Sequence, residues 1–169
     1  MNIPVIETQR LRLRGLRADD FEPYAAMMAD PEVTRFLADG KPLNRGDAWR
    51  QLAMILGHWE LRGFGLWAVE EKATGALLGR IGCYEPEGWP AFEVGYTLAR
   101  HAWGKGYASE GAAAALDFAR NTLGRRDVTS VIKTGNEGSV RVATKLGATL
   151  AETVPFYDGT AGIYRYPAV

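Results

Sequence analysis

The sequence is poor in the residues that form disulfide bonds and metal sites. Its 169 residues include one cysteine, Cys83, and two histidines, His58 and His101, which lie far apart. A single thiol cannot form a disulfide within the chain, so nothing points to an oxidising compartment. Because so few side chains of the kinds that bind zinc are present, we also expect no metal site.

The sequence also lacks an excess of charge of either sign and any long apolar stretch. Its 20 Lys and Arg residues balance its 20 Asp and Glu residues, so the formal net charge is +0. This balance argues against electrostatic binding to nucleic acid or anionic lipid. No apolar run reaches the roughly 18 residues of a membrane span, and the first residues do not resemble a signal peptide. We therefore expect a cytoplasmic protein that binds neither nucleic acid nor membranes.

What is present is typical of a globular domain. Hydrophobic residues make up 47% of the chain and charged residues 24%, which excludes a disordered composition. The length suits one core, and no internal repeat or shift in composition divides the sequence. We therefore predict one domain over residues 1–169.

Hydrophobic periodicity and capping residues predict the order of the secondary structure. Alternating residues predict strands near 11–14, 66–70, 77–84, 92–98, 128–133, 148–154 and 162–166. Helical spacing and caps predict helices near 20–28, 46–62, 107–123 and 137–146. The alanines at 112–115 leave the third helix thin enough to pack closely on a sheet. Because a meander of hairpins cannot be all parallel, we predict an α/β (α+β) fold on a mixed sheet.

The sharpest local signal is the segment Trp103-Gly104-Lys105-Gly106-Tyr107-Ala108, which lies between a predicted strand and a predicted helix. Its glycines let the backbone turn closely, and the unpaired N–H groups of a helix N-terminus favour an anion such as a pyrophosphate. The segment equally suits a tight turn without a ligand, and spacing alone leaves both possibilities open. Ser109 stands where the dinucleotide-binding pattern G-x-G-x-x-G needs its third glycine, and no P-loop pattern is present.

A series of segments, in order along the chain, resembles the GNAT acetyltransferases, and most closely the RimJ/RimL-type ribosomal-protein N-terminal acetyltransferases. The segments are ETQRLRLR (7–14), DPEV (30–33), TG (74–75), LGRIG (78–82), EVGYTL (93–98), WGKGYASE (103–110), NEGSVR (136–141) and KLGA (145–148). The resemblance covers nearly the whole chain, and the ordered set is far more specific than any one segment. His101 departs from the wider family, in which Gln or Arg usually stands at that position.

The resemblance implies a mixed, mostly antiparallel sheet of seven strands flanked by about four helices. It implies acetyl-CoA as co-substrate, bound where the strands 92–98 and 128–133 splay apart. The pantetheine arm is expected to pair with the backbone near Thr97 and Leu98, and Asn136 to contact it, cap the next helix, or do both. The pyrophosphate is expected on the backbone N–H groups of Trp103, Gly104, Lys105, Gly106, Tyr107 and Ala108.

Attack of an amine on a thioester needs a neutral amine and a proton for the leaving thiolate. Glu93, on the cleft strand, is the candidate base; the alternative is a structural carboxylate bonded to a neighbouring loop. Many GNAT enzymes carry an acid tyrosine on the last short helix, but that position holds Ala143 here. By resemblance to the RimL-like branch, Ser139 is the expected substitute; the alternative is a hydroxyl bonded to Asn136 or its backbone. An α-amine, with a pKa of about 7.7–8.0, demands less of the base than a lysine amine at about 10.4.

Several other residues have more ordinary explanations. Cys83 lies in an apolar strand, so a buried structural thiol is favoured over a nucleophile. Glu70 and Glu71, beside a turn, are expected to be solvated, and Glu110 to interact with its helix dipole. Candidates for the acceptor pocket are the aromatic residues Trp67, Trp89, Phe156 and Tyr157 and the acidic residues Asp39, Glu85, Glu87 and Asp158.

We therefore predict an N-acetyltransferase that moves an acetyl group from acetyl-CoA to a primary amine by direct attack in a ternary complex. The acceptor stays open between a protein N-terminal α-amine and a small-molecule amine, and the assembly between a monomer and a homodimer. A second hypothesis, suggested by the missing tyrosine, is a non-catalytic acyl-CoA-binding sensor on the same fold.

Overall fold

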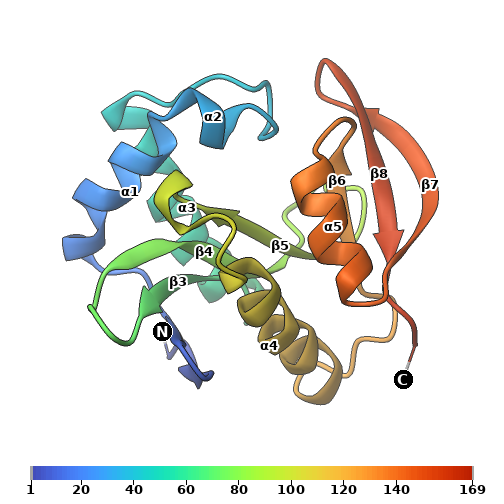
Figure 1. Ribbon diagram of the computed structural model, residues 1–169, viewed down its shortest axis with the longest axis horizontal. Helices are drawn as coiled ribbons and strands as arrows, with labels where there is room; N and C mark the ends of the chain where they lie inside the picture. The colour runs from blue at the N-terminus through green and yellow to red at the C-terminus, as the bar shows by residue number, and fades with distance from the viewer. Residues whose placement is uncertain (1, 169) are drawn as a thin grey trace.

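The fold is built on one eight-stranded sheet (Figure 1). The structure is a computed structural model and describes residues 2–168. The strands are β1 (Ile6–Glu7), β2 (Leu11–Arg14), β3 (Leu66–Glu71), β4 (Leu77–Tyr84), β5 (Glu93–Leu98), β6 (Thr129–Lys133), β7 (Thr149–Phe156) and β8 (Gly159–Arg165). Their order in the sheet is β1-β2-β3-β4-β5-β6-β8-β7. The β5–β6 pair is parallel, and the other neighbouring pairs are antiparallel.

The predicted fold class and the mixed, mostly antiparallel sheet are confirmed, but the predicted number of seven strands is wrong. The additional strand is β1, which has two residues and pairs Ile6 with Leu13 of β2. A strand of two residues is too short to show the alternation on which the prediction depended. The other strands begin and end within three residues of their predicted limits.

The helices are α1 (Phe21–Met28), α2 (Pro31–Thr34), α3 (Arg45–Arg62), α4 (Tyr107–Asn121) and α5 (Glu137–Lys145), with short 3-10 helices η1 (Ala18–Asp20) and η2 (Arg100–Ala102). Helix α2 was not predicted, because the sequence Asp30-Pro31 is expected only to end the helix before it. In fact the Asp30 carboxylate accepts a hydrogen bond from the Glu32 N–H, and Pro31 occupies the first turn. Within residues 2–168, no helix combines the length and apolar character needed to cross a membrane.

Helices cover both faces of the sheet. On one face, α4 packs so closely on β4 that a Cβ added at Gly111 would lie 2.5 Å from Cδ1 of Ile81. Figure 1 shows α5 beside α4 on this face. On the other face, the His58 ring of α3 stacks on Tyr84 of β4, with ring centroids 5.1 Å apart. Alternate residues of β4 therefore face α4 and α3, and this alternation decides which side chains reach the site.

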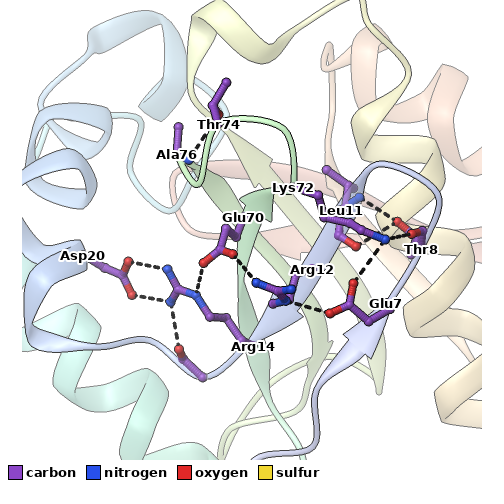
Figure 2. A network of polar contacts seen from close by, with 11 residues as sticks. Glu7, Thr8, Leu11, Arg12, Arg14, Asp20, Glu70, Lys72, Thr74 and Ala76 are labelled. Carbon is purple, nitrogen blue, oxygen red and sulfur yellow. Dashed lines mark hydrogen bonds and ion pairs between the residues drawn. The ribbon is translucent and has the colours of Figure 1, made fainter.

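A buried ionic network joins the first strands to η1 (Figure 2). The Arg14 guanidinium donates to both carboxylate oxygens of Asp20, at 2.7 and 2.8 Å, and to Glu70 at 2.6 Å. Arg12 donates to the second oxygen of Glu70 and to Glu7. Glu70 is buried, so the expectation that it is solvated is wrong. Its partners come from a strand far away in sequence, and no local pattern reveals them.

Candidate active site

The site opens where the parallel pair β5–β6 comes apart. The register pairs Glu93 with Thr129, and the Thr129 N–H donates to the Phe92 carbonyl. One step further, the Val131 N–H donates to the Glu93 carboxylate at 2.9 Å, and the Ser130 hydroxyl to the Val94 carbonyl. Side chains therefore replace the backbone ladder at this point, and the strands splay apart beyond it.

A cavity of about 590 Å3 lies between the end of β5, residues 32–37 and the first turns of α5, and continues past the N-terminus of α4. Its walls include nine of the residues predicted to bind the cofactor: Thr97, Leu98, Trp103, Gly104, Gly106, Tyr107, Ala108, Asn136 and Ser139. Lys105 is outside this lining, and its carbonyl accepts a hydrogen bond from Arg10 instead.

The backbone that faces the open cleft belongs to Tyr96, which the sequence analysis did not single out. The carbonyls of Phe92 and Val94 face β6, and the Ala99 N–H faces β4, where it donates to Leu78. Because backbone groups alternate along a strand, those of Tyr96 face the cleft and those of Thr97 face β4. The Leu98 carbonyl already accepts from the Trp103 indole at 2.8 Å.

The loop before α4 presents a row of free backbone donors. Gly104 and Gly106 have φ angles of 71° and 81°, in the left-handed region that favours glycine. The Trp103 N–H donates to the Arg100 carbonyl. Within the described part of the chain, the N–H groups of residues 104–109 donate to no protein acceptor. Such a row at the N-terminus of a 15-residue helix is suited to a pyrophosphate.

Glu110, in the first turn of α4, connects this loop by hydrogen bonds to the residues before β2. Its carboxylate accepts from the Thr8 hydroxyl at 2.6 Å, and from the backbone N–H and the Nε of Arg10, both at 2.7 Å. Burial raises the pKa of Glu110, but these hydrogen bonds outweigh burial and lower it overall. The role of Glu110 is therefore larger than the helix-dipole interaction expected from the sequence.

A second cavity, of about 160 Å3, adjoins the first. Both cavities are lined by Tyr96, Thr97, Asn136 and Ser139, so they meet at this point. The smaller cavity is also lined by Gln51, Arg80, Tyr84, Trp89, Glu93, Phe156 and Tyr157. The junction is therefore a place where a cofactor in one cavity can meet an acceptor in the other.

The candidates for the acceptor pocket divide into two groups. Trp89, Phe156 and Tyr157 line the smaller cavity, but Trp67 is fully buried in the core, where its indole donates to the Pro4 carbonyl. The four acidic candidates lie outside the lining. Asp158, for example, pairs with Lys133 at 2.8 Å.

Glu93 is 7% exposed and extends from β5 into the smaller cavity. One carboxylate oxygen accepts from the Val131 N–H and the other from the Trp89 indole, at 3.1 Å. Burial raises the pKa of Glu93 to about 7, although both hydrogen bonds and the positive charge of Arg80 act in the opposite direction. A carboxylate with this pKa can exchange a proton near neutral pH.

Ser139 lies in the first turn of α5, at the junction of the cavities. Its N–H donates to the Asn136 side-chain oxygen at 3.2 Å, which makes Asn136 the N-cap. The Asn136 amide nitrogen donates to the Ser139 hydroxyl oxygen at 2.9 Å. Because the hydroxyl oxygen is the acceptor, its own proton is available to another group.

Cys83 is fully buried and faces α4, with its sulfur 3.8 Å from the Ala115 carbonyl. Burial raises the pKa of the Cys83 thiol to about 12. A thiol that stays protonated and lines neither cavity suits a structural role.

The comparisons with known proteins agree with this geometry. Residues 10–149 match the family model described as the acetyltransferase (GNAT) domain. The chain is 31% identical to the uncharacterized protein YkkB of Bacillus subtilis (strain 168), over 94% of this chain and 92% of that one. An acetyltransferase structure from Agrobacterium tumefaciens strain C58 has a TM-score of 0.87 and 33% identity, and covers 98% of this chain and 95% of its own.

A more distant structure shares the fold. It is RimL, a ribosomal L7/L12 α-N-protein acetyltransferase in complex with coenzyme A, with a TM-score of 0.80 and 15% identity. The match covers 98% of each chain.

Proposed function

This chain belongs to the GNAT family of acetyl-CoA-dependent N-acetyltransferases, and from that premise we propose which residues bind the donor and which transfer the protons. The donor occupies the cavity of about 590 Å3, and the amine enters through the cavity of about 160 Å3. The observation that carries the proposal is the junction of the two cavities at Ser139, which the smaller cavity connects to Glu93.

The residues of the larger cavity fit coenzyme A. The free N–H groups of residues 104–108 provide donors for a pyrophosphate, and Gly104 leaves the approach open, with no heavy atom within 4 Å of an added Cβ. The Tyr96 backbone offers a strand-like edge to the pantetheine amides. When bound, the co-substrate supplies the thioester that carries the acetyl group.

Glu93 removes the proton from the acceptor ammonium, directly or through one water. With its pKa near 7, proton transfer from an α-ammonium of pKa about 7.7–8.0 is uphill by only about 1 kcal/mol. The same transfer from a lysine ammonium of pKa about 10.4 is uphill by about 5 kcal/mol. The geometry and this difference favour an α-amine as the acceptor.

Ser139 donates its hydroxyl proton to the sulfur that leaves. The hydrogen bond from Asn136 orients the hydroxyl oxygen, so that its proton points to the junction. We expect Ser139→Ala to lower kcat by about 100-fold, the lower end of the range for general acid catalysis, with little change in KM for acetyl-CoA. Steady-state thiol release measures both constants, and a wild-type kcat in this variant would exclude the role.

Coenzyme A binding tests the cavity assignment. We expect calorimetry to detect coenzyme A binding to the wild type and at least a tenfold weaker affinity in Gly106→Val. Valine disfavours a φ of 81°, and its Cβ would lie 3.3 Å from a guanidinium nitrogen of Arg10. Gly124→Val is the matched control, since Gly124 has a φ of 67° but lines neither cavity.

The absence of binding to both coenzyme A and acetyl-CoA in the wild type would remove the assigned cofactor cavity. Tight binding without thiol release, across a panel of α-amines and N-terminal peptides, would instead favour the acyl-CoA sensor.

A further inference from the structure

The smaller cavity contains a buried cation, Arg80, that forms no ion pair with the described residues. Arg80 is 8% exposed, and among the described residues its Nε has no hydrogen-bond partner and its guanidinium forms no ion pair. The comparably buried Arg14 has carboxylates on both sides. The contrast matters because an arginine cannot give up its proton, so a buried guanidinium stays charged.

The sheet register places this cation on the acceptor side. Arg80 pairs with Thr97 of β5, and Tyr84 of the same strand pairs with Glu93. Paired residues share a face of the sheet, so the four side chains are on one face. All four line the cavity of about 160 Å3.

The other charged groups of the cavity do not neutralise Arg80. Glu93 is committed to the Val131 N–H and the Trp89 indole, and its pKa of about 7 leaves it partly protonated at neutral pH. Lys133 also lines the cavity, but it is itself a cation, and it pairs with Asp158, which lies outside the lining. The remaining positive charge is therefore available to a ligand.

A neighbouring amide adds a donor. The Gln51 side-chain oxygen accepts a hydrogen bond from the Tyr24 hydroxyl at 2.6 Å, which leaves its NH2 group to donate. Gln51 also lines the cavity. A guanidinium and an amide NH2 group together suit a carboxylate, which accepts hydrogen bonds on two oxygens. A dianionic phosphate would bring a second negative charge next to Glu93, so it fits less well.

We propose that the acceptor of this enzyme is a primary amine that also carries a carboxylate, and that Arg80 binds this carboxylate while the amine is directed to Glu93 and Ser139. This proposal rests on the proposed function, because it names the substrate class of the same site. The carboxylate has two possible sources, a free amino acid or an acidic residue next to a peptide N-terminus.

The test is a comparison of matched acceptors. Thiol release is measured with amino acids and their carboxamides, and with peptides that have Asp or Asn, and Glu or Gln, after the N-terminal residue. We expect the wild type to prefer the carboxylate member of at least one kind of pair by about 100-fold in kcat/KM. A preference among the amino acids would identify a free amino acid as the source of the carboxylate, and a preference among the peptides would identify an acidic residue next to the N-terminus. Equal kcat/KM values within every pair would overturn the proposal.

Two variants assign the preference to Arg80. In Arg80→Met, the ratio of kcat/KM for the carboxylate acceptor to kcat/KM for its matched amide should fall close to one. Arg80→Lys should keep part of this ratio. Arg12→Met, a change on neighbouring β2 at an arginine paired with Glu7 and Glu70, should keep the wild-type ratio. Because methionine removes an unpaired buried charge, Arg80→Met should also have a melting temperature no lower than the wild type. Retention of the ratio in Arg80→Met would exclude the assigned role.

A binding measurement separates this proposal from the proposed function. Calorimetry in the presence of coenzyme A compares the binding of N-acetyl amino acids with that of N-acetyl amino acid amides. This measurement requires no catalytic turnover. Preferential binding of the acids, lost in Arg80→Met, would support the carboxylate site even if no amine were acetylated. Equal binding of acids and amides would overturn it, even if amines were acetylated.

Discussion

We expect Glu93→Gln to lower kcat/KM for an α-amine acceptor by about tenfold at pH 7, because only roughly 10–15% of an amine with a pKa of about 7.7–8.0 is neutral at that pH. The deficit should shrink to a few-fold above pH 9. Above the pKa of the amine, most acceptor molecules are already neutral and need no base. Below that pKa, the variant can react only with the small fraction of acceptor molecules that are neutral. A deficit of equal size at every pH would exclude the role as base.

The free energy of unfolding of Glu93→Gln is the control, because it shows whether a loss of activity could come from a loss of stability. The pKa of Glu93 is raised from 4.5 to about 7 in the folded state, so folding becomes less favourable as the pH rises between these two values. Glutamine removes this cost, although one of its two hydrogen bonds is lost. At pH 8 we expect Glu93→Gln to be more stable than the wild type, by on the order of 2 kcal/mol in urea unfolding. Below pH 4 the gain should disappear.

The largest effect on stability is expected from Arg14→Met. This change leaves the buried carboxylates of Asp20 and Glu70 without their shared partner (Figure 2). Removing one member of a buried ionic network typically costs about 3–5 kcal/mol. Urea unfolding at pH 7 should therefore show a loss of this size in the free energy of unfolding. Arg12→Met is the control: Arg12 is 43% exposed, so its loss should cost no more than about 1 kcal/mol.

The dependence of the Arg14→Met effect on pH follows from the carboxylates. Burial raises the pKa of Asp20, but its hydrogen bonds with Arg14 and the Arg17 N–H outweigh burial; the pKa of Glu70 is lowered mainly by Arg14. Groups with lowered pKa values stabilise the wild type above their unfolded pKa values of about 4, and this contribution is lost as the pH falls. The difference between variant and wild type should therefore narrow below pH 4. A loss under 1 kcal/mol at pH 7 would show that the network contributes little.

Features encoded by neighbouring residues were predictable. The two glycines before α4 and the Asn136 cap of α5 depend on residues within one turn of each other. The thin face of α4 was also predictable, since alanine is small wherever it stands; Ala112 and Ala115 are fully buried against the sheet. The two-residue strand β1 was missed because its structure depends on β2 rather than on its own pattern.

The sequence by itself determined the order of the elements, the loop before α4 and the family, because periodicity, caps and turn residues act over a few positions. Only the tertiary structure decided how charges are matched. It paired Glu70 with Arg14, 56 residues away, and placed Glu93 across the splay to the Val131 N–H, 38 residues away. It also left the buried Nε of Arg80 without a hydrogen-bond partner among the described residues. Electrostatic interactions depend on distance and burial in space, which no local pattern of residues specifies.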